Sequence, residues 1–386
     1  DPRRTATCDI ADLHLALAPG ADGALFNLLL AEIDQKSKTH PEFIEHLEGL
    51  SDAVAAARQV TPSQTGLAHS ELQSFLKIWL QSNKVVTVYS QGINQSDSGT
   101  DKVNAILNCH LATGRIGRPG MGPFSVTGQP NAMGGREVGG LANMLACHLE
   151  IENPVHRAAV QGFWAAPSMA EKPGLKAVDM FRAVEDGRIK ALWIICTNPA
   201  VSMPEADRVA AAIKGCDFTV VSEMFGQTDT ARLAHVLLPA TGWGEKDGTV
   251  TNSERRISRQ RRLLAAPGQA RDDWRILAEV ARRMGWGAAF SWESPAQIFA
   301  EYAALSGIAG DLGSDFDISD HAGISEEAYD SLAPFLWPQS ARKRGGRFFA
   351  DGRFHTASGK ARMVAVTPRP PQPLEAAYPF RLNTGR

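Results

Sequence analysis

Three short apolar segments, separated by stretches with helical periodicity, constrain the fold of this chain more than any other feature of its sequence. The segments are rich in aliphatic and β-branched residues, which favour strands. The predicted strands are 191–195, 218–221 and 235–238, and the predicted helices are 180–186, 204–213 and a short one near Thr230. Strands that alternate with helices at this spacing predict an α/β fold with a doubly wound, mainly parallel sheet.

Polar residues follow two of these strands at the point where each strand ends. Thr197 and Asn198 come after the first strand, and Ser222 and Glu223 come after the second. Ligands of parallel sheets bind at the carboxyl ends of the strands, where these side chains would gather. The alternative is that Asn198 and Ser222 only shape turns and cap helices. We expect a ligand site at this edge, because two successive strand ends are polar.

A second strand–loop–helix pattern precedes this region. Residues 84–89 predict a buried strand, 90–99 a polar loop and 100–112 a helix, which together form the opening of a βα unit. Nearer the start of the chain, the apolar positions over 23–33 fall on a helical stripe. Asp22 directly precedes that stripe and is placed to act as the N-cap of the helix.

The segment 114–140 is too rich in glycine and proline to predict regular elements. Its few hydroxyl side chains argue against a flexible linker. Glycine lets the backbone approach a bulky ligand or another chain segment closely, so we expect this segment to line a ligand site. A long loop packed over a core is the alternative.

The length of 386 residues predicts two or three domains. The predicted division is 1–128, 129–290, 291–377 and 378–386, of which the third part is helical or irregular and contains a proline-rich linker over 367–373. The chain begins at Asp1 without a Met and ends at Arg386 without a terminating pattern, so we expect a piece of a longer protein.

Composition excludes several function classes. Lys and Arg number 40 against 42 Asp and Glu, and the formal charge of −2 argues against a protein that coats nucleic acid or an anionic membrane. No apolar run reaches the length of about 18 residues that a membrane span needs. The five cysteines are odd in number and never form C-x-x-C, so buried reduced thiols are expected rather than disulfides or structural zinc.

The strongest local charge cluster is the basic run 254–262. A solvated or salt-bridged face is the first interpretation of this run. Contact with phosphates, or an electropositive approach for a small anion, is the second.

Six collinear motifs extend over essentially the whole chain. They are 92–95 with Gly99, 110–120, 122–139, 197–199, 237–239 and 243–256. The longest reads Gly122-Pro-Phe-Ser-Val-Thr-Gly-Gln-Pro-Asn-Ala-Met-Gly-Gly-Arg-Glu-Val-Gly139. Together they resemble the molybdopterin oxidoreductases that carry molybdenum on two pterin guanine dinucleotides, and most of all the catalytic subunits of assimilatory nitrate reductases. The resemblance implies two Rossmann-like cofactor-binding domains, 1–128 and 129–290, and the start of a truncated molybdopterin-dinucleotide-binding domain at 378–386.

The resemblance also implies cofactor contacts. Asp1, Arg3 and Thr5 match a segment that reads one guanosine in the family. Gly20, Ala21 and Asp22 match a second contact on that nucleotide, and a carboxylate such as Asp22 accepts two hydrogen bonds from a guanine edge. The other implied contacts are Gln91, Gln95, Asn198, Ser222, Glu223, Lys246, Asp273, Thr384, Gly385 and Arg386. Glu223 is Asp in many relatives, which changes the reach of this side chain.

One position bears on the substrate. Formate dehydrogenases of the family carry an Arg two residues before the Gln of an R-G-Q-N-N motif, whereas this chain has Thr127 two residues before Gln129, as nitrate reductases do. The resemblance thus implies reduction of nitrate to nitrite, with Thr127 and Gln129 as catalytic candidates and with Arg136 and the arginines near 255 favouring anion access. A formate dehydrogenase-like enzyme is one alternative. A non-catalytic descendant of the fold, as in respiratory complex I, is the other.

The resemblance implies further parts that this chain does not carry. The cysteines for a [4Fe–4S] cluster and the Cys that ligates molybdenum would lie upstream of Asp1, so this chain is expected to hold no metal ligand and to be inactive alone. An electron-donor protein or domain is implied, either ferredoxin, flavodoxin or an NADH-linked reductase. The assimilatory resemblance favours a cytoplasmic location, with neither nucleic acid nor membrane as a partner.

Overall fold

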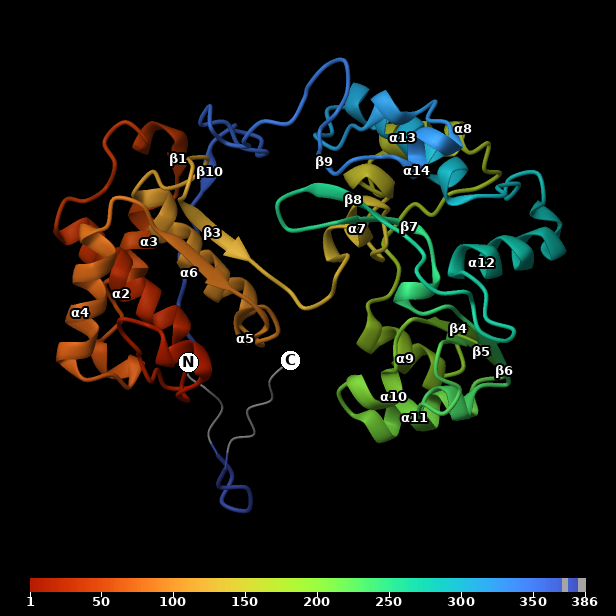
Figure 1. Ribbon diagram of the computed structural model, residues 1–386. Helices are drawn as coiled ribbons and strands as arrows, with labels where there is room; N and C mark the ends of the chain where they lie inside the picture. Colours follow the sequence, from red (N-terminus) through yellow and green to blue (C-terminus); the bar gives the residue numbers. More distant parts are fainter. Residues whose placement is uncertain (370–373, 381–386) are drawn as a thin grey trace. The chain divides into compact units, whose positions relative to one another are not determined.

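The computed structural model describes residues 1–369 and 374–380, which form two compact units (Figure 1). The first unit comprises Asp1–Gly128 with Gly346–Arg386, and the second comprises Gln129–Gly345. Part of the predicted linker, 370–373, and the implied contacts Thr384, Gly385 and Arg386 lie outside the described residues. The four-part division of the chain stays a prediction.

Helices dominate the first unit. They are α1 (Ala6–Asp9), α2 (Asp22–Gln35), α3 (Leu50–Ala57), α4 (His69–Gln81), α5 (Gln91–Asn94) and α6 (Gly99–Ala112). The strands are β1 (Leu47–Glu48), β2 (Val86–Tyr89), β3 (Gly122–Ser125) and β10 (Ala361–Arg362). The predicted helices 23–33 and 100–112 are confirmed as α2 and α6, which pack against each other.

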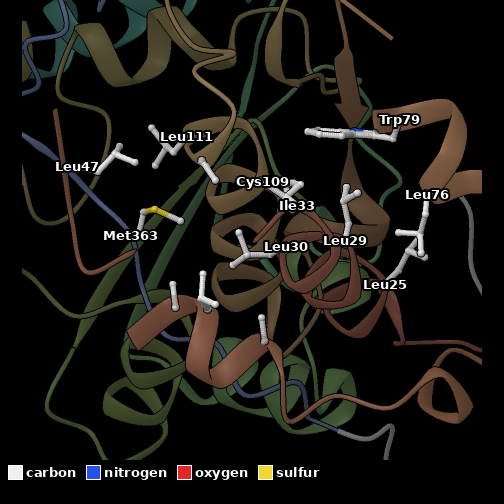
Figure 2. Packing of buried hydrophobic residues seen from close by; sticks show 14 of the residues in the cluster. Leu25, Leu29, Leu30, Ile33, Leu47, Leu76, Trp79, Cys109, Leu111 and Met363 are labelled. Atoms are coloured by element: carbon white, nitrogen blue, oxygen red, sulfur yellow. The ribbon is translucent and has the colours of Figure 1, made fainter. Parts of the chain in front are cut away.

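The core of the first unit surrounds α2. Leu29, Leu30 and Ile33 point into a cluster with residues of α4 and α6, and all three are at most 1% exposed (Figure 2). Met363 reaches the same cluster from the segment that follows β10. The pairing of β10 with β1 holds this returning segment in place, because Met363 N donates to the carbonyl of Glu48. Burial of this apolar surface is the main stabilising contribution to the unit.

Two expectations for residues 90–140, which extend from the first unit into the second, are corrected. The predicted polar loop 90–99 contains the one-turn helix α5, and the glycine-rich segment 114–140 contains strand β3 and helix α7 (Ala132–Glu137). Strand β3 forms because its backbone pairs in parallel with β2, from Gly122 opposite Val86 to Ser125 opposite Tyr89. Composition alone could not predict this element, since the partner strand supplies its hydrogen bonds.

The second unit contains a parallel sheet with flanking helices. Its order is β4 (Ala191–Ile195), β5 (Phe218–Glu223) and β6 (Val236–Pro239), with both pairings parallel. Helices α9 (Ala177–Glu185), α10 (Pro199–Ser202) and α11 (Ala206–Gly215) accompany it (Figure 1). Ile194, Val221 and Ile213 are at most 5% exposed and join sheet and helix in one core. The predicted α/β class with parallel sheets is confirmed.

An antiparallel sheet and further helices complete the second unit. The strands are β7 (Gly248–Thr251), β8 (Arg256–Gln260) and β9 (Phe335–Leu336), and the remaining helices are α8 (Pro154–Phe163), α12 (Asp273–Ala281), α13 (Pro295–Asp311) and α14 (Glu326–Asp330). Helix α8 begins where Asn153 Oδ1 accepts a hydrogen bond from Val155 N at 2.9 Å and Pro154 occupies the first turn. Across residues 1–369 and 374–380, no helix is both long and apolar enough to cross a membrane.

Candidate functional site

The carboxyl edge of the sheet β4–β5–β6 gathers several of the residues singled out above. Asn198 lies three residues beyond β4, and its Oδ1 accepts hydrogen bonds from Thr230 N at 3.1 Å and Thr230 Oγ1 at 2.6 Å. The side-chain oxygen of Asn198 therefore shapes the loop after β4, in agreement with the interpretation of Asn198 as a turn residue. No residue in the described part of the chain accepts a hydrogen bond from Asn198 Nδ2, which leaves this donor for a ligand.

The two polar residues at the end of β5 differ in what they can offer. Ser222 is 2% exposed, and its hydroxyl accepts a hydrogen bond from Trp193 Nε1 at 2.9 Å, so its side chain is committed to packing. Glu223 is half-buried, and its Oε1 accepts from the amides of Met224 at 2.8 Å and Phe225 at 3.4 Å. Among the described residues, Glu223 Oε2 has no donor, so one carboxylate oxygen can meet a ligand.

A charged pair lies beside this edge. Lys246 Nζ lies 2.6 Å from Asp273 Oδ2, and both side chains are 24% exposed. Asp273 is the first residue of α12, and its other oxygen accepts a weak hydrogen bond from Cys196 Sγ at 3.7 Å. The fold thus joins residues that are up to 77 positions apart in the sequence.

Cys196 is a residue of this edge that sequence reasoning missed. The five cysteines were expected to be buried; four are, but Cys196 is exposed. It follows β4 directly and has a left-handed backbone, with φ of 59°. Partial burial raises the pKa of the Cys196 thiol, and the negative charge of Asp273 raises this pKa further. Its position directly after a predicted strand was the signal that could have revealed it.

In the first unit, the ends of β2 and β3 bring Gln91 and Thr127 together. Gln91 Nε2 donates to Thr127 Oγ1 at 3.0 Å across the carboxyl edge of this parallel pair. Gln95 is exposed at the end of α5. Gln129, the other catalytic candidate, is exposed and belongs to the second unit.

The N-terminal candidates lie in two local arrangements. Asp1 Oδ1 accepts from Arg3 N at 3.0 Å, and Thr5 Oγ1 lies 3.4 Å from the Sγ of Cys8. In the second arrangement, Gly20 has a φ of 88° and Ala21 is buried, and both shape the turn before α2.

Asp22 differs from its prediction. It is the first residue of α2 rather than its N-cap, which is Ala21. Its Oδ2 pairs with Lys102 Nζ at 3.0 Å, and the Lys102 side chain is only 7% exposed. Sequence reasoning did not identify Lys102, because only the packing of α6 on α2 brings this ammonium to the carboxylate.

The basic run 254–262 is salt-bridged, as the first interpretation held. Arg256 pairs with Glu254 at 2.7 Å, and Arg262 pairs with Asp272 at 2.7 Å. The side chain of Arg259 is 2% exposed. Its guanidinium lies 2.6 Å from an Asp247 oxygen and 3.9 Å from the centre of the Tyr329 ring. Carboxylates thus engage Arg256, Arg259 and Arg262, and a role of the arginines near 255 in anion access stays a prediction.

No group of three or more His, Cys, Asp or Glu side chains within residues 1–369 and 374–380 is arranged to hold a metal ion. One cavity of the second unit has a volume of about 650 Å³, and none of the predicted site residues lines it. The carboxyl edge is an open polar surface, and we consider it the better candidate because donors and acceptors converge there.

Comparison with known proteins assigns the chain to a family. The model of the molybdopterin oxidoreductases matches residues 1–283, which is well over half of the chain. The chain belongs to the molybdopterin oxidoreductase family. In this molybdopterin oxidoreductase, the motif 92–95 follows strand β2, the motif 122–139 contains β3 and the residues after it, and the motif 197–199 follows β4.

Relatives of this molybdopterin oxidoreductase include nitrate reductases. The chain is 48% identical to a nitrate reductase of Klebsiella oxytoca and 46% identical to one of Shewanella frigidimarina. All of this chain is covered in both comparisons, against 44% and 42% of the relatives. The chain therefore spans less than half the length of these two relatives.

A solved structure shares the fold. Acetylene hydratase from Pelobacter acetylenicus superposes with a TM-score of 0.68 over 97% of this chain and 53% of its own. At 16% sequence identity, this likeness bears on the fold alone.

Proposed function

We propose that the full-length protein is a molybdenum-dependent nitrate reductase and that this chain forms walls of the sites for two pterin guanine dinucleotides. The observation that carries this proposal is the similarity of the whole chain to nitrate reductases at 48% identity. Thr127, in place of the Arg of formate dehydrogenases, adds support for nitrate over formate. The reaction adds two electrons and two protons to nitrate and releases nitrite and water.

The carboxyl edge of β4–β5–β6 fits a large polar ligand. Asn198 Nδ2 offers a donor, Glu223 Oε2 an acceptor, and Lys246 a cation that Asp273 holds in place. These are the groups that a heteroaromatic edge and a pyrophosphate require. Ser222 would hold the end of β5 in position for the ligand, because its hydroxyl accepts from Trp193 Nε1 and its backbone carbonyl accepts from Cys196 N. When bound, the molybdenum–pterin group supplies the redox chemistry, and the protein supplies binding and orientation.

The second nucleotide site of the proposal lies in the first unit. Asp22 keeps one carboxylate oxygen, Oδ1, without a donor among the described residues, and the buried Lys102 holds the other. A guanine edge presents two adjacent donors, and the Asp22 carboxylate still has room to accept from both. Lys102 would therefore orient this carboxylate without using up its capacity to accept hydrogen bonds. Arg3, Thr5, Gly20 and Ala21 are the further contacts of this site, together with Gln91 and Gln95 near the pterin.

For the substrate, we propose that Thr127 and Gln129 line the approach and that Arg136 attracts the anion. Arg136 lies near the end of α7, is exposed, and donates within its own helix to the Ala132 carbonyl at 3.1 Å. An exposed guanidinium draws a monovalent anion by long-range attraction. If Arg136→Ala left the nitrate kinetics unchanged, this role would be dismissed.

Further parts of the proposal concern the protein beyond this chain. We propose a [4Fe–4S] cluster, an electron-donor protein or domain, and a cytoplasmic location, as the assimilatory resemblance implies. This chain alone is expected to be inactive, because the resemblance places the Cys ligand of molybdenum in a different segment of the family's proteins.

The test uses the full-length protein. Oxidation of a reduced viologen dye is measured with and without nitrate, beside an assay for bound molybdenum. Nitrate-dependent oxidation with bound molybdenum supports the proposal. Bound molybdenum without nitrate turnover would point to formate or another substrate, and a folded protein without molybdenum would point to the non-catalytic descendant.

A further inference from the structure

Glu137 is a buried carboxylate that the proposed function does not use. It is the last residue of α7, is 1% exposed, and lies next to the exposed Arg136. Its Oε2 accepts from Thr251 Oγ1 at 2.7 Å, and its Oε1 accepts from Trp337 Nε1 at 2.7 Å. No Lys, Arg or His among the described residues forms an ion pair with it, and burial raises the pKa of this carboxyl group.

The other end of α7 is fixed to the same threonine. Asn131 directly precedes the helix, and its Oδ1 accepts from Thr251 N at 2.9 Å. Thr251 ends strand β7, so its backbone amide holds the start of α7 and its hydroxyl holds the end. A six-residue helix is too short to be stable alone, and these contacts decide its orientation.

Two adjacent glycines of α7 differ in how much space surrounds them. A Cβ on Gly134 would lie 2.2 Å from Asn131 Oδ1, which crosses the first turn of the helix to reach Thr251. A Cβ on Gly135 would meet nothing within 4 Å. A side chain at position 134 would therefore displace Asn131 from its contact with Thr251. A side chain at position 135 would be tolerated.

We propose that Glu137 and Asn131 are positioning residues that clamp α7 onto Thr251 and Trp337, and so hold Arg136 where it meets the substrate anion. This inference rests on the proposed function for the identity of the anion, but the clamp itself is a property of the second unit. Strand β7 begins two residues after Lys246, which pairs with Asp273. The clamp therefore also connects the helix that carries Arg136 to the segment that carries Lys246.

The test compares Glu137→Ala, Glu137→Gln and Thr251→Val in the full-length protein. Glu137→Ala removes both acceptors and is expected to raise the KM for nitrate about tenfold with kcat changed less than about threefold, because a misplaced cation weakens binding of the ground state and of the transition state alike. Glu137→Gln keeps an acceptor for Trp337 and a donor for Thr251, so it should restore the KM. Thr251→Val should resemble Glu137→Ala in part.

Gly134 and Gly135 supply a matched pair of variants. A double mutant tests whether Glu137 affects the KM through Arg136. Gly134→Ala should raise the KM, whereas Gly135→Ala should not. In an Arg136→Ala background, Glu137→Ala should add little, because the two changes remove one effect. An equal KM increase in Glu137→Gln and Glu137→Ala, or full additivity with Arg136→Ala, would overturn the proposal.

Hydrogen exchange separates the clamp from the proposed activity. Amides of residues 132–140 should exchange faster in Glu137→Ala than in the unmodified protein or in Glu137→Gln. If the full-length protein does not reduce nitrate, the proposed function fails, and this exchange pattern by itself decides whether Glu137 positions α7. Unchanged exchange in Glu137→Ala would refute the clamp.

Discussion

Lys246 Nζ and Asp273 Oδ2 lie 2.6 Å apart beside the carboxyl edge of the parallel sheet, although they are 27 positions apart in the chain. Lys246 follows the turn after β6, and Asp273 begins α12, so the pair forms only when both elements fold against the sheet. A partly exposed pair of this kind contributes up to about 1 kcal/mol to stability. Under the proposed function, the pair serves to bind the cofactor more than to stabilise the fold.

Lys246→Ala is therefore expected to weaken cofactor retention more than stability. Loss of a charge-assisted contact with an anionic ligand lowers its affinity about tenfold, which corresponds to about 1.4 kcal/mol. Molybdenum per full-length protein after extensive dialysis, beside the Tm, measures both quantities. Arg256→Ala is the control, since its ion pair with Glu254 lies in the same unit and outside the proposed site. Unchanged molybdenum retention in Lys246→Ala would contradict the role of this ammonium.

Because His110 is buried, we expect the stability of the first unit to depend on pH. His110 is fully buried, its Nε2 lies 2.7 Å from Thr87 Oγ1, and burial lowers its pKa to about 4. The unfolded chain binds a proton near pH 6.5 while the folded chain does not, so stability is present above that pH and is lost as the pH falls towards 4. The loss amounts to at most about 3 kcal/mol.

Urea unfolding of the full-length protein between pH 7.5 and 4.5 checks this expectation. His110→Asn should flatten the acid limb of the stability profile, whereas His69→Gln, an exposed change on α4, should not. If His110→Asn lost as much stability at acid pH as the unmodified protein, other titratable groups would be the cause of that loss.

Two glycines with similar backbone angles predict different effects of an added methyl group. Gly117 has a φ of 68°, and a Cβ there would lie 2.4 Å from the carbonyl oxygen of Phe349. Gly187 has a φ of 71° with nothing within 4 Å. Gly187→Ala should cost about 1 kcal/mol for the left-handed conformation. Gly117→Ala should cost about 1–3 kcal/mol more, because the carbonyl must move. Urea unfolding midpoints measure both, and equal losses would contradict the steric argument.

Among the five cysteines of this chain, Cys196 is expected to react first with N-ethylmaleimide in the native protein, since the other four are buried. Its reaction should be slow at pH 7 and faster at higher pH, because burial and Asp273 raise the pKa of the thiol. Asp273→Asn should accelerate the reaction at neutral pH by removing the negative charge. Peptide mass spectrometry after brief labelling locates the modified residue, and preferential labelling of Cys109 or Cys147 would contradict the prediction.

The residue pattern alone determined the alternation of strands and helices. The predicted strand at 191–195 matches β4, and those at 218–221 and 235–238 lie in β5 and β6 within a few residues at their ends. Local periodicity also marked α2 and α6. Parallel pairing then follows from connection by helices, so the strand-end position of Asn198 and Ser222 was predictable.

Tertiary structure alone decided which polar groups remain available at the site. Ser222 is engaged by Trp193 and Asp22 by Lys102, and Glu137 meets Trp337 across 200 positions. Strand β3 exists in a glycine-rich segment because β2 supplies its hydrogen bonds. Sequence periodicity reports only which side of an element is buried. The partner of a buried polar group depends on which distant elements pack together, and no local pattern contains that information.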